Sequence, residues 1–244
     1  MIDLSIVIPA LNEASKIKHD VETAALFLTE TVKKGEIIVV DDGSTDGTAD
    51  TARNTATPES VDLIVIKQVK NYGKGYAVKT GMLRSHGEVV MFADSGTCVS
   101  YSDALSIIEK IRRGELDIAL GSRRLKSSVI QRDQPLFRRI LSRIFHMAAV
   151  LIAGLPRKIK DSQCGFKVYD GEKARLLFSE CKTKGFLFDV EILIRAQKKG
   201  YRIQEFPIEW TCDLDTRLRP GSDAAGVIRE LFSLRKIKAD KKSE

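Results

Sequence analysis

The feature that most constrains the fold is an acidic turn that directly follows a β-branched run. Residues 37–40 read Ile-Ile-Val-Val, and Asp41 and Asp42 stand where this run ends. The turn chemistry that follows comes from Gly43, Ser44, Asp46 and Gly47. In an open parallel α/β sheet the ligand crevice lies beyond the carboxyl ends of the strands. The stretch therefore predicts a strand that delivers two carboxylates to a ligand site, against the simpler interpretation of a solvated acidic turn.

Apolar strands and helical patterns alternate on both sides of this turn. Further strands are predicted at 4–8, 62–67, 88–93 and 117–120, and helices at 17–28, 48–55, 76–86 and 101–113. Two strands joined by a helical crossover run parallel. The pattern therefore predicts the α/β class, with a Rossmann-like, mostly parallel twisted sheet flanked by helices.

The chain after residue 125 is more basic and less regular. Residues 126–134 are polar and predict a mobile loop, and 161–169 predict a short extended segment. A helix at 186–199 and a final strand at 202–210 follow. Because proline has no N–H to donate to a neighbouring strand, Pro207 indicates that the final strand lies at a sheet edge.

Two basic amphipathic helices are predicted in this part of the chain, at 135–155 and 223–238. The first carries apolar residues on one side and arginines elsewhere, and it becomes almost wholly apolar towards its end. Such a helix can lie at a membrane interface. Packing against its own sheet explains the same pattern, and both interpretations stay open.

Charge and cysteine usage narrow the function classes. Lys and Arg exceed Asp and Glu by 40 to 33, and the excess lies mostly in the second half, which suits an anionic partner. The four cysteines stand far apart without a Cys-x-x-Cys pair, so zinc and a disulfide framework are not expected. No apolar run reaches the length of about 18 residues that a transmembrane helix needs. Few aromatics interleave with the basic residues, and no nucleic-acid module is recognisable, so nucleic acid is not an expected partner.

A glycine loop at residues 71–75, Asn-Tyr-Gly-Lys-Gly, opens the predicted helix at 76–86. Glycines permit close backbone approach, and a helix N-terminus attracts anions, so the loop is a candidate phosphate cradle. It is neither a Walker loop nor a complete Gly-x-Gly-x-x-Gly fingerprint, because Val78 replaces the third glycine. A phosphate role and a purely structural role therefore both stay open.

Five segments together resemble the family 2 glycosyltransferases of the GT-A fold, over residues 3–235. They are Ser5-Ile-Val-Ile-Pro-Ala-Leu-Asn-Glu13, Val39-Val-Asp-Asp-Gly-Ser-Thr-Asp46, Asn71-Tyr-Gly-Lys-Gly75, Phe92-Ala-Asp94 and Gly121-Ser-Arg123. Two more, Asp161-Ser-Gln-Cys-Gly-Phe-Lys167 and Phe188-Asp-Val-Glu191, resemble dolichyl-phosphate β-glucosyltransferases and their polyprenyl-phosphate relatives more than dolichyl-phosphate mannose synthases.

The resemblance implies an inverting transfer of a hexose, with glucose from UDP-glucose as the first candidate, onto a polyprenyl or dolichyl-type monophosphate. GDP-mannose and other nucleotide sugars are the alternative donors. It also implies a GT-A catalytic domain over 1–210, with a nucleotide-sugar-binding half at 1–124 and an acceptor half at 125–210, before a basic C-terminal segment at 211–244. We expect a cytoplasmic protein, peripheral on the cytoplasmic face of a membrane that it contacts through the helices at 135–155 and 223–238.

The resemblance further implies roles by position. The residues expected at the nucleotide and sugar of the donor are Pro9, Ala10, Glu13, Asp41, Asp42, Lys74, Asp94 and Ser95. Arg123 and Asp189 are the expected catalytic residues, and Asp189 matches the position where inverting members often carry a base. The basic residues expected to attract the acceptor phosphate are Arg124, Arg132, Arg138 and Arg139.

One departure concerns the metal. The family carries Asp-x-Asp after the fourth strand, whereas this chain has Asp94-Ser95-Gly96. Mg²⁺ commonly takes one or two carboxylates plus substrate phosphates, so Asp94 is expected to hold Mg²⁺ or Mn²⁺ weakly together with the donor. Replacing Gly96 by aspartate is expected to raise metal affinity. A non-catalytic nucleotide-binding protein on the same fold is the alternative that this departure favours.

The acceptor chemistry bears on the role of Asp189. A lipid monophosphate is already anionic at neutral pH, because its second pKa is about 6 by analogy with phosphorylated side chains. It has less need of a general base than a hydroxyl acceptor would. Asp189 is therefore expected to orient groups rather than to take a proton.

Overall fold

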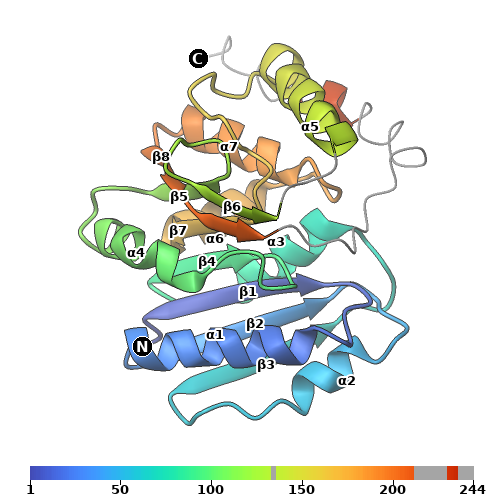
Figure 1. Ribbon diagram of the computed structural model, residues 1–244, viewed down its shortest axis with the longest axis vertical. Helices are drawn as coiled ribbons and strands as arrows, with labels where there is room; N and C mark the ends of the chain where they lie inside the picture. Colours follow the sequence, from blue (N-terminus) through green and yellow to red (C-terminus); the bar gives the residue numbers. More distant parts are fainter. Residues whose placement is uncertain (133–135, 212–229, 236–244) are drawn as a thin grey trace.

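A seven-stranded sheet in the order β3-β2-β1-β4-β7-β5-β8 runs through the centre of the molecule (Figure 1). The computed structural model describes residues 1–132, 136–211 and 230–235, with backbone only for 136–141. The strands are β1 Leu4–Ala10, β2 Gly35–Asp41, β3 Val61–Lys67, β4 Val89–Ala93, β5 Ile118–Ser122, β7 Phe166–Asp170 and β8 Ile203–Pro207. Neighbours pair in parallel except β7, which is antiparallel to β4 and β5.

Helices cover both faces of this sheet. One face packs against α1 Ile17–Thr31, α2 Thr48–Arg53, the 3₁₀ turn η1 Tyr101–Ala104 and α4 Leu105–Arg112. The other packs against α3 Lys74–Arg84, α6 Gly171–Glu180, α7 Phe188–Lys198 and the π-helical turn η2 Ala149–Ala153, which continues α5 Leu136–Ala148. Because both faces are covered, β1 and β2 are buried along their whole length, which explains the apolar runs at 6–8 and 37–40.

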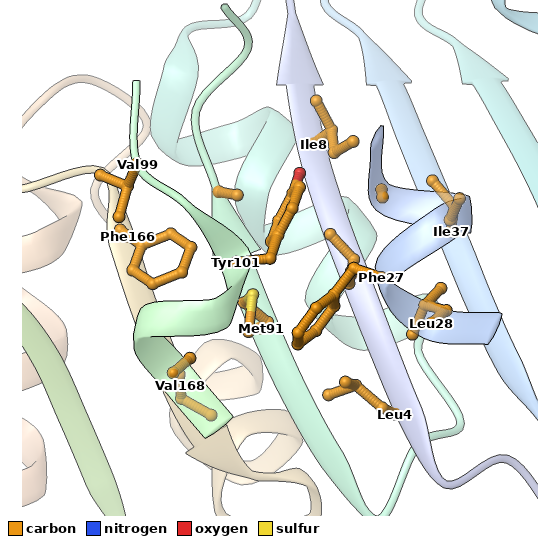
Figure 2. Close-up of a cluster of buried hydrophobic side chains, with 14 of the residues drawn as sticks. Leu4, Ile8, Phe27, Leu28, Ile37, Met91, Val99, Tyr101, Phe166 and Val168 are labelled. Carbon is orange, nitrogen blue, oxygen red and sulfur yellow. The ribbon is translucent and has the colours of Figure 1, made fainter. Parts of the chain in front are cut away.

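The core under α1 and η1 is rich in aromatic rings. Figure 2 shows Phe27 and Tyr101 against β1 and β4, with ring centroids 5.5 Å apart. Tyr101 in turn lies 6.1 Å from the ring of Phe166 on β7. Burial of one such large side chain stabilises the fold by about 1.5–3 kcal/mol. This packing joins α1, η1 and β7, and β7 pairs with β4 in antiparallel register from Val89–Asp170 to Ala93–Phe166.

The predicted fold class and the edge position of Pro207 are confirmed, but the second half differs from expectation in two places. Residues 129–132, predicted to be loop, form strand β6 Val129–Arg132, because Val129 donates to the Ile208 carbonyl at 3.0 Å and β6 pairs with β9 Glu209–Thr211. The single strand predicted at 202–210 is accordingly divided into β8 and β9.

The helices of the second half also differ from expectation. Helix α6 was not predicted, although the Asp170 carboxylate caps it by accepting the Lys173 N–H at 3.0 Å. The helix predicted at 135–155 changes from α to π geometry after Ala148 and ends at Gly154. The helix predicted at 223–238 lies outside the described residues except for 230–235, which are helical. Over the described ranges, no helix has both the length and the apolar character that crossing a bilayer requires.

The sheet topology brings several loops to one edge. The carboxyl ends of β1, β2, β4 and β5 lie at this edge, and the antiparallel β7 starts there. The sequence segments that carry acidic and basic residues after these strands therefore converge.

Candidate active site

Asp42 at the end of β2 holds the glycine loop. Its N–H donates to the Ala10 carbonyl at 2.8 Å, and its two carboxylate oxygens accept the N–H groups of Tyr72 and Gly73, both at 2.9 Å. Burial raises the pKa of Asp42, against the effect of these two hydrogen bonds. The carboxylate therefore fixes the backbone that leads to Lys74.

Asp41 points into the protein. Its side chain is fully buried, and one oxygen accepts the Ser44 N–H at 2.7 Å. Within the described ranges, the other oxygen has no hydrogen-bond partner. A buried carboxylate oxygen that lacks a donor is a polar group that a bound ligand can satisfy.

The loop after β1 is tied to the turn after β2. Asn12, at φ 53°, accepts the Thr45 N–H at 3.0 Å through its side chain. The Glu13 N–H donates to the Thr48 hydroxyl at 2.8 Å, and Glu13 itself is buried. Pro9 and Ala10 are the buried last residues of β1. The predicted nucleotide residues of β1 and β2 therefore form one rim, which we call the β2 rim: Pro9, Ala10, Glu13, Asp41 and Asp42.

The glycines of the loop at 71–75 allow α3 to start very close to a later segment. A Cβ on Gly73, where φ is 106°, would lie 2.5 Å from the Lys184 carbonyl oxygen, and one on Gly75 would lie 2.7 Å from that of Gly185. The N–H of Gly73 is engaged by Asp42. The glycines thus act in packing, and the cation of the loop, Lys74, reaches the end of β4.

Four charged side chains gather beside the end of β4; we call them the charge cluster. Lys74 Nζ lies 2.7 Å from the Asp94 carboxylate, and Lys167 Nζ lies 2.8 Å from that of Asp189. The ring of Phe92 lies against both ammonium groups, with its centroid 5.6 Å from Lys74 Nζ and 5.5 Å from Lys167 Nζ. Lys167 and Asp189 are buried, whereas about a third of the Asp94 side chain is exposed.

The two pairs influence each other electrostatically. Burial raises the pKa of Asp189, and the charges of Lys167 and Lys74 oppose that rise. Burial also opposes the charge of Lys74, but Asp94 and Asp189 outweigh it and raise the pKa of the ammonium. Lys74 therefore stays charged while it faces the exposed edge of the cluster.

The turn after Asp94 is built around a glycine and a buried acid. Gly96 has φ 95°, and both carboxylate oxygens of Asp20 on α1 accept its N–H at 3.0 Å. Asp20 also accepts the Thr97 hydroxyl at 2.7 Å. On the other side, a Cβ on Gly165 would lie 1.9 Å from an Asp94 oxygen. Asp94 and the half-buried Ser95 are thus held in a tight turn.

This turn offers a metal ion one carboxylate, that of Asp94. Gly96 occupies the position of the second carboxylate and has φ 95°, where a residue with a Cβ costs stability; the predicted gain of metal affinity by Gly96→Asp stays a prediction. Asp94 is already paired with Lys74. Among the described residues, no group of three or more His, Cys, Asp or Glu side chains is placed to hold an ion.

Arg123 forms a buried ion pair that the sequence did not indicate. Its Nε and one terminal nitrogen donate to the two oxygens of Asp161, both at 2.7 Å, and its guanidinium lies 5.2 Å from the Trp210 ring centroid. Burial opposes both charges, but their pairing lowers the pKa of Asp161 and raises that of Arg123. Arg123 therefore anchors the loop before β7 beside the site.

The other arginines predicted to attract phosphate are spread over this side. Arg124 donates to the Lys160 carbonyl at 2.7 Å and to the Ser142 hydroxyl of α5 at 3.1 Å. Arg132 is exposed at the end of β6. Arg138 and Arg139 lie on α5, where their side chains are outside the described residues.

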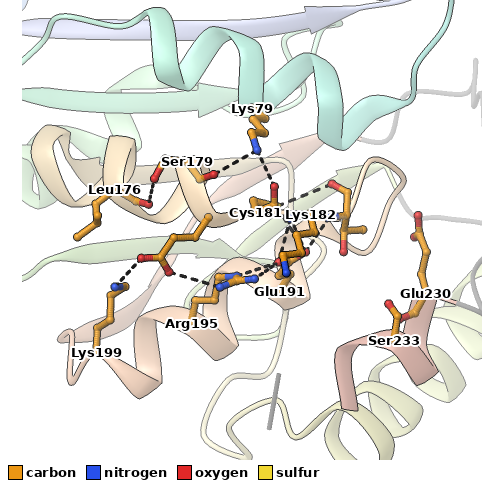
Figure 3. Close-up of polar contacts among 12 residues, drawn as sticks. Lys79, Leu176, Ser179, Cys181, Lys182, Glu191, Arg195, Lys199, Glu230 and Ser233 are labelled. Atoms are coloured by element: carbon orange, nitrogen blue, oxygen red, sulfur yellow. Dashed lines mark hydrogen bonds and ion pairs between the residues drawn. The ribbon is translucent and has the colours of Figure 1, made fainter. Parts of the chain in front are cut away.

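A second acidic residue of α7 braces the loop that α3 packs against. Glu191 accepts the Lys182 and Thr183 N–H groups and pairs with Arg195 at 2.7 Å (Figure 3). From the helical segment at 230–235, Glu230 accepts the Gly185 N–H at 3.2 Å. The loop that contacts the start of α3 is therefore held from two sides.

Comparison with known proteins agrees with this geometry. Residues 5–171 match the family described as Glycosyl transferase family 2. The chain belongs to this family. The match runs from β1 to the first residue of α6 and so contains both the β2 rim and the end of β4.

Curated relatives of similar sequence are dolichyl-phosphate β-glucosyltransferases. That of Dictyostelium discoideum is 34% identical over 242 residues, covering 95% of this chain and 73% of its own length. That of Saccharomyces cerevisiae is 34% identical over 250 residues, covering 95% of this chain and 74% of its own length. The human protein is 34% identical over 225 residues, covering 85% of this chain and 67% of its own length. These relatives align with 85–95% of this chain, and together with the family match they show that the chain is a glycosyltransferase.

Solved structures share the fold. Glucosyl-3-phosphoglycerate synthase from Mycobacterium tuberculosis, in complex with Mn²⁺, UDP-glucose and phosphoglyceric acid, superimposes with a TM-score of 0.65 at 19% identity, over 96% of this chain and 78% of its own. Mannosyl-3-phosphoglycerate synthase from Rubrobacter xylanophilus superimposes with a TM-score of 0.64 at 15% identity, over 100% of this chain and 76% of its own. The predicted GT-A fold is confirmed, and the former protein carries a divalent ion.

Proposed function

We propose that this protein is an inverting glycosyltransferase that moves glucose from UDP-glucose to a polyprenyl phosphate of the dolichyl type. The observation that carries the proposal is the meeting of the β2 rim and the charge cluster through one loop. Asp42 holds Gly73, and the next residue, Lys74, pairs with Asp94. The names of the relatives supply glucose as the sugar and dolichyl phosphate as the acceptor, and UDP-glucose is the donor bound in a solved structure of the same fold.

The β2 rim is the proposed nucleotide site. It offers a buried Asp41 oxygen without a donor partner among the described residues, and backbone fixed by Asn12 and Asp42. A uracil ring carries an N–H that such an oxygen can accept. We assign the uridine to this rim and the diphosphate to the adjoining Lys74 and Asp94, where the side-chain ammonium meets the anionic end of the donor.

The acceptor phosphate is proposed to enter from the side of β6 and α5. Arg124 and Arg132 on that side, with Arg138 and Arg139, supply positive charge. The phosphate attacks as an anion, because its second pKa is about 6. Asp189 is buried and paired with Lys167, so its proposed role is to position the lysines and not to take a proton.

Contact with a membrane is proposed through α5, η2 and the helical segment at 230–235. Ile144, Met147 and Leu151 recur at helical spacing and are each more than half exposed, and Phe232 is 55% exposed. Arg143 is exposed in the same stretch. This combination suits an anionic lipid surface that presents the acceptor, and the proposed location is the cytoplasmic face.

The transfer reaction is tested by incubating the purified chain with radiolabelled UDP-glucose and dolichyl phosphate in detergent, followed by extraction of the lipid. We expect a lipid-linked product whose glucose is in the β configuration. GDP-mannose and other UDP-sugars serve as competing donors. Binding of UDP without any lipid-linked product from any donor would refute the proposal and favour a non-catalytic nucleotide-binding protein.

The membrane contact is tested by sedimentation with vesicles that contain phosphatidylserine. We expect the double variant Met147→Glu/Leu151→Glu to leave the lipid fraction, because it places charges in the apolar stripe. The matched control is Leu26→Glu on α1, an apolar residue that is 60% exposed on another helix. Equal retention of the wild type and the double variant would show that another surface binds lipid.

A further inference from the structure

The end of β4 already contains a cation. The Lys74 ammonium lies 2.7 Å from the Asp94 carboxylate, and the exposed fractions of the two side chains are 27% and 34%. The pair is therefore within reach of a bound donor. By contrast, Lys167 is 0% exposed and is paired with Asp189 inside the protein. Lys74 is thus the ammonium of the charge cluster that a diphosphate can meet.

In the turn after Asp94, Gly96 stands where the family carries a second carboxylate. The N–H of Gly96 is held by Asp20, and its φ of 95° is costly for any residue with a Cβ. Asp20 uses both oxygens on this N–H and on the Thr97 hydroxyl. A divalent ion would therefore find a single carboxylate here, and it would have to separate that carboxylate from Lys74.

We propose that Lys74 is the resident cation of this site and neutralises the leaving nucleoside diphosphate, so that sugar transfer does not depend on a divalent metal ion. The inference rests on the proposed function. In the transfer step, the bond between the anomeric carbon and the β-phosphate oxygen breaks, and its electron pair stays on that oxygen. An oxygen of the acceptor phosphate forms the new bond to the anomeric carbon, and no proton changes hands. The Lys74 ammonium faces the oxygen that gains charge.

The position of Lys74 is defined by its surroundings. It is the first residue of α3, directly after the Gly73 N–H that Asp42 holds. Its ammonium lies against the ring of Phe92, 5.6 Å from the centroid. A charge that is fixed before the donor binds needs little reorganisation when negative charge develops, which is the condition for effective electrostatic catalysis.

The test measures glucose transfer and UDP binding in parallel, with EDTA and with Mn²⁺. For the wild type we expect the same transfer rate and the same UDP affinity in both conditions. Lys74→Met should lower the transfer rate by about 100-fold, the effect of removing one preorganised charge-stabilising donor. It should also weaken UDP binding in EDTA by about tenfold, because a charge-assisted hydrogen bond is lost. Lys74→Arg should recover most of both losses because it keeps the charge.

Lys70→Met is the matched control, since it removes an exposed lysine of the preceding loop, and it should behave as the wild type. Transfer that disappears in EDTA and returns with Mn²⁺ in both the wild type and Lys74→Met would overturn the inference and leave the proposed function standing. UDP binding that requires Mn²⁺ would overturn it as well. The absence of lipid-linked product in every condition would instead overturn the proposed function, and the inference would fall with it.

Discussion

Aspartates that lie at the same edge of the sheet serve different purposes. At the β2 rim, the oxygens of Asp42 are engaged by backbone N–H groups, and the carboxylate organises a loop. In the charge cluster, Asp94 and Asp189 are engaged by lysine ammonium groups. The partner type decides what a carboxylate does, although the sequence places Asp42 and Asp94 in similar positions after apolar strands.

The β2 rim and the charge cluster also differ in how much stability the protein loses when one carboxylate is removed. Loss of Asp42 frees backbone that other contacts still restrain, such as the packing of Gly73 on Lys184. Loss of Asp189 leaves a lysine that is 0% exposed without its counter-charge. Removing one partner of a buried pair is more damaging than removing an acceptor of neutral donors. The β2 rim should therefore be more tolerant than the charge cluster.

The largest effect is expected for Asp189→Ala, which leaves the Lys167 ammonium buried and unpaired. We expect the free energy of unfolding to fall by about 3–5 kcal/mol, as measured by urea denaturation at pH 7. The double variant Lys167→Met/Asp189→Leu should recover most of this loss, because it removes both charges and keeps the volume apolar.

A control for this measurement is Asp62→Ala, which breaks the exposed pair that Lys34 and Asp62 form at 2.6 Å. Exposed pairs contribute less than about 1 kcal/mol, so the control should be nearly neutral. Equal losses for Asp189→Ala and Asp62→Ala would remove the distinction between the two kinds of carboxylate.

The next effect is that of Asp42→Ala, which leaves the N–H groups of Tyr72 and Gly73 without acceptors. We expect a loss of about 2 kcal/mol in the free energy of unfolding and about tenfold in UDP affinity, measured by urea denaturation and calorimetry. Asp42→Asn keeps one acceptor oxygen and should lie between the wild type and Asp42→Ala. The exposed Asp50→Ala on α2 is the control. Unchanged UDP affinity in Asp42→Ala would show that the nucleotide binds elsewhere.

The difference between the two regions also marks what the sequence could predict. The strand ends at Asp41 and Asp94 followed from apolar runs that stop at an acid, which is a local pattern. The parallel direction of β1 and β2 followed from the helical crossover between them. The sequence could therefore predict which strand ends carry the site, both from these local patterns and from the motifs that resemble the family.

The partners of the charged groups could not be predicted. Asp20 meets Gly96 across 76 residues, and Asp161 meets Arg123 across 38. Such pairings depend on how the helices and loops pack over the sheet, and no periodicity encodes them. The strand at 129–132 was missed for the same reason, because its partner Glu209 lies far along the chain.

A loss of stability similar to that of Asp42→Ala is expected at the turn after Asp94. Gly96→Asp should lower the free energy of unfolding by about 2 kcal/mol, since it combines left-handed strain with a carboxylate close to Asp20. Gly114→Asp is the matched control, because φ is +66° there and a Cβ would meet nothing within 4 Å. It should lose about 1 kcal/mol from strain alone. A Gly96→Asp variant that is stable and binds Mn²⁺ tightly would show that the turn tolerates a second metal ligand.

The smallest effect extends the comparison to the pH dependence of two other aspartates. Asp20 is held by an N–H and a hydroxyl, and burial raises its pKa in spite of these hydrogen bonds. Asp117 is held by Arg202 and Lys173, whose hydrogen bonds lower its pKa. The reference is the unfolded aspartate, with a pKa of about 3.9.

The signs of the two effects are opposite. A raised folded pKa gives stability that is full below the unfolded pKa and is lost as the pH rises through the folded value. The free energy of unfolding of the wild type should therefore rise relative to that of Asp20→Asn as the pH falls from 7 towards 4. A lowered folded pKa gives stability that is present above the unfolded pKa and is lost as the pH falls through the folded value, so the wild type should lose its advantage over Asp117→Asn below pH of about 4. Urea denaturation of the three proteins from pH 7 to below pH of about 4 measures both slopes. Slopes of the same sign would mean that the partner type does not govern these carboxylates.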